Sequence, residues 1–355
     1  MKSIENQGDL HGYPPFHVKF FLQKVRIVIH PHSFITSTMA TSPNRPIEPM
    51  QRDRSPLARR LDDAFVWLTG GFALLIGVLL ISIAVRVGTD ATPAIGKFGL
   101  GFLFESRWDP VKEIFSAFPQ IYGTLVSSLL ALLLAVPIGL GVAILLSEDI
   151  LAERIKRPIV FLIELLAAIP SVVYGLWGIF VLIPILREVG GVINQGFGWL
   201  PFFSTKPSGP GMYAAAVVLA IMILPIITAI SRDALVAVPP ELRQAAYGLG
   251  ATRWETLLKV ILPAAFSGIV GGIMLALGRA MGETMAVTMV IGNANKANVS
   301  IFDQGSTVSS LLANQFAEAS GLQVSSLMYA ALVLFGLTLV VNILAQLVVR
   351  RVNRI

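Results

Sequence analysis

The chain has 355 residues, of which 55% are hydrophobic and 14% charged, and its mean hydropathy is +0.74. This composition excludes an ordinary soluble domain, in which about a quarter of the residues are charged. The absence of cysteine excludes disulfides, thiol nucleophiles and cysteine metal sites. The net charge of +6 does not indicate a nucleic-acid partner, because the basic residues gather in loops on alternate sides of six apolar segments.

The N-terminal region is polar apart from residues 17–32, HVKFFLQKVRIVIHPH, which are too few and too interrupted by Lys24 and Arg26 to span a membrane. They also lack the small-residue cleavage site of a signal peptide. The residues that follow are polar and proline-rich, a composition typical of disorder. We interpret residues 1–38 as a disordered extension from an upstream start codon, in preference to a functional arm, and residues 39–60 as a cytoplasmic tail.

Six apolar stretches follow, each near or above the roughly 20 residues that a helix needs to cross a membrane. They are Ala64–Val85, Ile121–Leu146, Ile159–Leu186, Tyr213–Ile230, Ala264–Ile291 and Leu327–Val348. None shows the short alternating pattern of a membrane β-barrel. The sequence therefore predicts an all-α polytopic membrane protein with six transmembrane helices. Four prolines inside the spans predict kinks: Pro137, Pro170, Pro184 and Pro225. Neighbouring helices or water can form hydrogen bonds with the backbone groups that each kink frees.

The loops between these spans differ in basic charge, with twice as many lysines and arginines on one side as on the other. The richer side holds Arg52, Arg54, Arg59, Arg60, Arg154, Lys156, Arg157, Arg232, Arg243, Arg253, Lys259, Arg350, Arg351 and Arg354. The poorer side holds Arg86, Lys97, Arg107, Lys112, Arg187, Lys206 and Lys296. Basic loops stay in the cytoplasm. We therefore expect a multi-pass protein of the bacterial inner membrane with both termini in the cytoplasm.

The loop between the fourth and fifth spans, at about residues 232–263, carries helix signals. Pro240 and Glu241 suit the first turn of a helix, and Gly248 and Gly250 can end it. Residues 252–255, TRWE, match a capping box that starts a second helix. The pattern predicts a helix, a glycine turn and another helix. This unit is either a docking element or a surface hairpin without a special role.

The fifth span contains two opposite charges, Arg279 and Glu283, in an otherwise uncharged run. Arg279 lies 16 residues after Pro263, which is about 24 Å along a helix and past the midplane of the membrane. A charge at that depth costs at least ~2.5–3.5 kcal/mol, so it should face protein or water. Glu164, near the start of the third span, is a weaker candidate.

A helical wheel places both charges in one arc of about 140° together with five glycines. These are Gly268, Gly271, Gly272, Gly278 and Gly282. We expect this arc to face the protein interior, with Gly278 and Gly282 as a close-packing motif. An i,i+4 salt bridge of Arg279 with Glu283 is then either purely structural or part of an anion path, to which the planar donors of arginine are suited.

The stretch QAAYGLGATRWETLLKVILP resembles the EAA loop of ABC-importer permeases, with Gln244 where the family usually has glutamate. The matching positions are Gln244, Ala245, Ala246, Gly250, Val260, Leu262 and Pro263. Residues 122–148, 164–182 and 278–293 are similar to phosphate-specific permeases of the PstC type, and the likeness covers residues 56–355. The resemblance implies a type I ABC-importer permease domain at residues 61–355, without cofactor, metal or catalytic residues.

The resemblance also implies partners: a second permease subunit of the PstA type, a cytoplasmic ATPase dimer that docks on the loop, and an extracytoplasmic phosphate-binding protein. The sequence has no GxxxxGK[ST] phosphate loop, so ATP hydrolysis falls to a separate chain. We expect the permease subunit of an ATP-driven phosphate importer, with Arg279 and Glu283 in the anion path.

Two other functions are considered. The first is a secondary anion symporter in which Glu283 carries the proton that balances the anion bound at Arg279. The second is a membrane enzyme, which is disfavoured because the spans contain no histidine, cysteine or lysine for nucleophilic chemistry.

Overall fold

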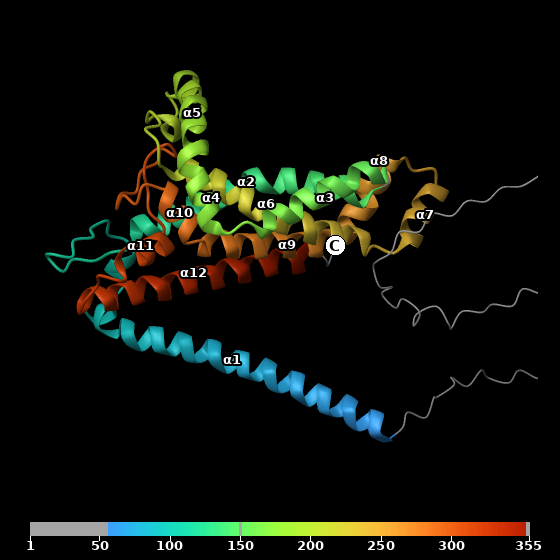
Figure 1. Cartoon of the computed structure of the whole chain (residues 1–355), viewed down its shortest axis with the longest axis horizontal. Coiled ribbons are helices and arrows are strands. Elements are labelled where there is room, and N and C mark those ends of the chain that lie inside the picture. The colour runs from blue at the N-terminus through green and yellow to red at the C-terminus, as the bar shows by residue number, and fades with distance from the viewer. Residues whose placement is uncertain (1–55, 149–150, 353–355) are drawn as a thin grey trace, which may run out of the picture. The chain divides into compact units, whose positions relative to one another are not determined.

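The computed structural model describes residues 56–148 and 151–352, and their regular elements are all helical. The helices are α1 (Pro56–Phe98), α2 (Phe118–Ser147), α3 (Glu153–Ala168), α4 (Ser171–Trp177), α5 (Ile183–Phe197), α6 (Met212–Val236), α7 (Pro240–Gly248), α8 (Arg253–Thr256), α9 (Leu262–Gly282), α10 (Met285–Val290), α11 (Val308–Gln315) and α12 (Leu322–Val352) (Figure 1). The all-α prediction is confirmed. The expected extension and most of the tail lie outside the described residues.

Six helical stretches in the described residues are long and apolar enough to cross a membrane, as predicted. They are Arg60–Leu103, Phe118–Ser147, Ser171–Phe197, Met212–Val236, Arg253–Gly282 and Leu322–Leu347. The second, fourth and sixth agree closely with the predicted spans. The third and fifth differ, because each predicted span contains a helix break.

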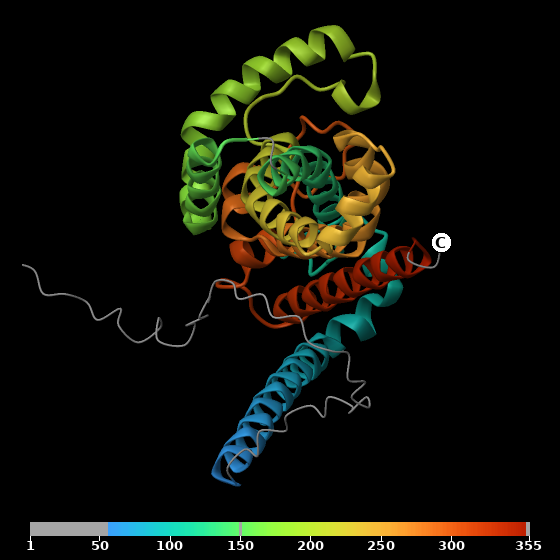
Figure 2. The same cartoon turned by 90° about the vertical axis from the view of Figure 1, so that its right-hand side faces the viewer.

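Helices α2, α6 and α9 lie side by side and form the centre of the fold (Figures 1 and 2). Small buried residues on α2, including Ala131, Ala135 and Gly139, recur every four residues and form one face of that helix. Small residues let membrane helices approach closely, which matters because lipid gives no hydrophobic drive for helix association. Ile227 of α6 packs against Gly139, and Thr228 donates a hydrogen bond to the Gly139 carbonyl at 3.3 Å.

Helix α9 meets α6 through two glycines of the predicted arc. A Cβ at Gly268 would lie 2.6 Å from the Ala234 Cβ, and one at Gly272 would lie 2.9 Å from the Ile230 Cγ2. The expected packing motif at Gly278 and Gly282 is not found, since a Cβ at either position meets nothing within 4 Å. The glycine contacts with α6 therefore lie in the first half of α9 and do not extend to Gly278 and Gly282.

The predicted third span is interrupted at Pro170. Proline has no N–H, so the carbonyl of Leu166 loses its normal i+4 donor. The hydroxyl of Tyr174, which is 5% exposed, donates to that carbonyl at 2.8 Å. Beyond the break, α4 leads through a π-helical turn (Gly178–Leu182) into α5, which runs across the direction of α2, α6 and α9 (Figures 1 and 2).

Much of α1 exposes apolar side chains, and its C-terminal part contributes to a buried cluster. Ala91 and Ala94 are fully buried in a cluster with Phe102, Phe115 and Tyr329. The aromatic rings of Phe102 and Tyr329 stack at 4.4 Å between centroids. This cluster joins the end of α1 to the start of α12.

The close approach of α6 and α9 predicts a strong difference between two neighbouring glycines. Gly272→Val should lower the thermal unfolding temperature of the detergent-solubilised chain by roughly 2–10 °C, because overpacking costs about 1–3 kcal/mol. Gly271→Val is the matched control, since a Cβ there has no neighbour within 4 Å. Equal shifts in the two variants would contradict the packing described above.

Candidate functional site

The loop between α6 and α9 has the predicted helix–turn–helix form. Pro240 occupies the first turn of α7, and the helix ends at Gly248. Gly250 has φ of +84°, in the left-handed region that favours glycine, and its N–H donates to the Tyr247 carbonyl at 2.9 Å. The N–H of Ala251 donates to the Ala246 carbonyl at 3.0 Å. The turn is therefore closed by backbone hydrogen bonds.

The predicted capping box is present at the start of α8. The Thr252 hydroxyl accepts from the Glu255 N–H at 3.3 Å, and the Glu255 carboxylate accepts from the Thr252 N–H at 3.0 Å. From there the helix continues through a π-helical turn (Leu257–Ile261) into α9 without a break, from Arg253 to Gly282. At 1.5 Å per residue, Arg279 lies about 39 Å along this helix from Arg253. The start of α8 and Arg279 therefore belong to one continuous helix.

The tip of this loop exposes apolar and amide side chains. Leu249, Trp254 and Tyr247 are 90%, 63% and 45% exposed. Gln244 and Ala245 are also exposed, whereas Ala246 is buried and Leu262 half-buried. An open pocket of about 660 Å³ lies between α7 and α8, lined by Glu148, Arg243, Tyr247, Ala251, Arg253, Trp254 and Leu257. Exposed aromatic residues beside a polar pocket are typical of a protein-docking surface.

The two intramembrane charges do not form the predicted salt bridge. Helix α9 ends at Gly282, and Glu283 has an extended backbone with ψ of 127°. Its carboxylate accepts from the Ala286 N–H at 3.3 Å, one of the first-turn donors of α10 that lack a helical partner. The prediction was wrong because the i,i+4 relation requires an unbroken helix, and here the side chain of Glu283 caps the next helix instead.

The prediction that the glycine-rich arc of the fifth span faces the protein interior is also wrong at Arg279. The face of α9 that packs against the rest of the chain carries Ala265, Ile269, Gly272, Ala276 and Ala280. Gly271, Leu275 and Arg279 lie on the opposite, exposed side. Arg279 lines an open groove of about 690 Å³ with Ile226 of α6, Asn342 of α12 and Gly271, Met274, Leu275 and Gly278 of α9. Among the described residues, no carboxylate forms an ion pair with Arg279.

The two broken helices meet next to this arginine. Helix α4 packs on α10, since a Cβ at Gly175 would lie 3.3 Å from the Ala286 Cα and one at Gly178 would lie 2.8 Å from the Val290 Cγ1. Interrupted membrane helices are tolerated where they line a cavity or pack in protein, and they often border transport sites.

Sequence reasoning missed one neighbour of Arg279 in the groove, Asn342. Asn342 interrupts the apolar run LVVNILAQLV, a signal that the sequence displayed. Glu164 does not join this group: it lines a separate pocket of about 340 Å³ with Leu146, Glu153, Lys156, Arg157, Val160, Phe161 and Arg232.

Comparison with known proteins matches residues 135–354 to the family described as binding-protein-dependent transport system inner membrane component. The phosphate transport system permease protein PstC of Haemophilus influenzae is 44% identical over 299 residues, covering 83% of this chain and 95% of the relative. PstC of Pasteurella multocida is 45% identical, with 80% and 90% covered. A probable PstC of Methanocaldococcus jannaschii is 35% identical, with 83% and 95% covered.

Among solved structures, a chain of the inward-facing MetNI methionine ABC transporter is similar, with a TM-score of 0.50 and 21% identity. The match covers 66% of this chain and 94% of that chain. This likeness supports the fold predicted from the sequence.

The capping contact at Glu283 predicts how its variants fold. Glu283→Gln keeps an oxygen that can accept from the Ala286 N–H, so the thermal stability of the solubilised chain should stay close to wild type. Glu283→Ala removes the acceptor and should cost about 0.5–2 kcal/mol, the usual loss of a helix cap. Equal destabilisation by both variants would show that the negative charge, rather than the capping oxygen, matters at this position.

Proposed function

The chain belongs to the binding-protein-dependent transport system inner membrane component family, and we propose that it is the permease subunit of an ATP-driven phosphate importer. The relatives named as phosphate transport permeases cover at least four fifths of the chain at 35–45% identity. The observation that carries the mechanism is the unbroken helix from the exposed loop to Arg279. It connects a docking surface to a charge in the membrane.

The groove beside Arg279 is one wall of the proposed anion path. Its open side exposes Gly271, Leu275 and Arg279, a combination that lipid does not favour. A second permease subunit of the PstA type facing this groove encloses the arginine in a polar passage. The free guanidinium then offers phosphate its planar donors. Glu283 contributes to this path by holding the start of α10, and the charge of Arg279 stays available.

The exposed loop is the proposed contact with a cytoplasmic ATPase dimer. The residues assigned to it by the family pattern are Gln244, Ala245, Ala246, Gly250, Leu262 and Pro263. Gln244 and Ala245 are exposed at the α7 surface, and Gly250 sets the turn. This assignment places both termini in the cytoplasm of a bacterial inner membrane, as the basic loops predict. An extracytoplasmic phosphate-binding protein delivers the anion on the other side.

The two alternatives have less support. A secondary symporter needs no docking loop, and the relatives are subunits of phosphate transport systems rather than single-chain symporters. A membrane enzyme has less support because the predicted spans contain no histidine, cysteine or lysine. We therefore assign ATP hydrolysis to a separate chain and transport to this one.

The left-handed turn at Gly250 predicts that substitutions there act through the backbone conformation. A side chain at Gly250 meets nothing within 4 Å, so any effect arises from φ of +84°. Gly250→Val should insert normally but lose the ATPase subunit in pull-downs from membranes. Gly250→Asn is the control, because asparagine tolerates positive φ, and it should retain the ATPase. Normal ATPase capture by Gly250→Val would remove the turn from the docking role.

The anion path is tested in proteoliposomes that hold this chain, the PstA-type subunit, the ATPase and the binding protein. Wild-type uptake of phosphate should require internal ATP and be independent of a proton gradient. Arg279→Gln should reduce uptake by roughly 10- to 100-fold, because a charge-assisted hydrogen bond contributes about 1.5–3 kcal/mol. Arg279→Lys should be intermediate, since it keeps the charge and loses the planar fork.

Arg187→Gln, an exposed arginine of α5, serves as the matched control and should transport normally. Because Arg279 and Glu283 form no ion pair, adding Glu283→Gln to Arg279→Gln should not restore uptake. Restoration in that double variant, or uptake that follows the proton gradient without ATP, would overturn the assignment.

A further inference from the structure

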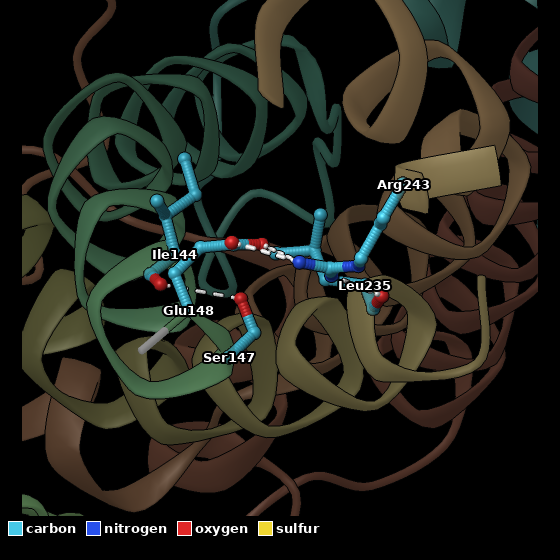
Figure 3. A network of polar contacts seen from close by, with 5 residues as sticks. All are labelled: Ile144, Ser147, Glu148, Leu235 and Arg243. Atoms are coloured by element: carbon cyan, nitrogen blue, oxygen red, sulfur yellow. Dashed lines mark hydrogen bonds and ion pairs between the residues drawn. The ribbon is translucent and has the colours of Figure 1, made fainter. Parts of the chain in front are cut away.

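One ion pair joins the exposed loop to a distant part of the chain. Nη1 of Arg243 in α7 lies 2.6 Å and 2.7 Å from the two carboxylate oxygens of Glu148, which is 95 residues away (Figure 3). The Arg243 and Glu148 side chains are 22% and 14% exposed. The pair Lys97–Glu113, by comparison, is 49% and 62% exposed at 3.4 Å. Exposed pairs contribute little, whereas breaking a largely buried one leaves a charge without its partner.

Glu148 lies at the end of a long helix, and Arg243 contacts the end of another. Glu148 directly follows α2, and its N–H donates to the Ile144 carbonyl at 3.0 Å. A carboxylate at a helix C-terminus is unfavourable by itself, since that end carries partial negative charge. The guanidinium of Arg243 offsets this charge and also donates, through Nη2, to the Leu235 carbonyl at 3.4 Å.

Leu235 lies in the last turn of α6, where carbonyls have no helical donor. One guanidinium therefore contacts the ends of both α2 and α6, and it does so from the first half of α7. Figure 3 shows Arg243 and Glu148 pointing toward one another. No backbone hydrogen bond is described between α7 and the end of α2.

We propose that Arg243 and Glu148 form a positioning pair, which fixes α7 to the α2 end so that motion of the loop moves α2 and α6 as well as α9. This inference rests on the proposed function and adds a second connection through which movement of the loop reaches the membrane helices. The first connection is the continuous α8–α9 helix. The second is ionic, and it connects α7 to the helix pair that packs at Gly139 and Ile227.

The test measures phosphate uptake per ATP hydrolysed in the reconstituted complex. Arg243→Gln and Glu148→Gln should each lower this ratio about tenfold, compared at equal amounts of bound ATPase. The exchanged pair, Arg243→Glu with Glu148→Arg, should recover it to within about threefold. The exchange of Lys97 and Glu113 is the control and should leave the ratio unchanged. Wild-type coupling in the single variants would overturn the proposal.

A second measurement reads the position of α7 without transport. The chain has no cysteine, so a spin label at Gly248→Cys reports on α7 alone, and a side chain there meets nothing within 4 Å. In the full chain in nanodiscs, Arg243→Gln and Glu148→Gln should increase label mobility. Unchanged mobility would overturn the pair even if transport falls or the exchanged variant does not fold. If the wild type imports no phosphate, the proposed function is wrong. The mobility measurement still shows whether Arg243 and Glu148 hold α7 in position.

Discussion

The structure depends on one constraint: a backbone carbonyl or N–H inside a membrane must find a partner within the protein. Two helix breaks create such groups here, and at each break one side chain supplies a partner for one of them. Tyr174 donates to the carbonyl that Pro170 cannot serve, and Glu283 accepts from an N–H at the start of α10. The helices that follow the two breaks, α4 and α10, pack against each other.

The two halves of α9 have different surroundings. The first half packs closely against α6 at Gly268 and Gly272. On its N-terminal side, α9 is continuous with the helix that begins in the exposed loop at Arg253. Its second half leaves Arg279 on an open groove. In the proposed function, this continuous helix converts displacement of the docking turn at one end into displacement of the charge at the other. The ion pair of Arg243 with Glu148 extends this connection to α2.

The surface of the chain indicates that it works within an assembly. Apolar side chains of α1 and aromatic side chains of the loop are exposed, and the arginine in the groove has no carboxylate partner among the described residues. Lipid can cover the apolar side chains but not the arginine. In the proposed function, a second permease subunit facing α9 gives that charge polar surroundings, and the proposed path lies between the two chains.

The sequence by itself determined the six spans, the capping box at Thr252 and the turn at Gly250, because each follows from hydropathy or from contacts within a few residues. It also located Arg279 as the unusual charge. Only the tertiary structure decided that Glu283 caps α10, that Arg279 faces an open groove and that Arg243 reaches Glu148. A helical wheel assumes an unbroken helix and does not indicate which face is covered. Those outcomes depend on competition between capping and helix continuation, and on contacts between residues far apart in the chain.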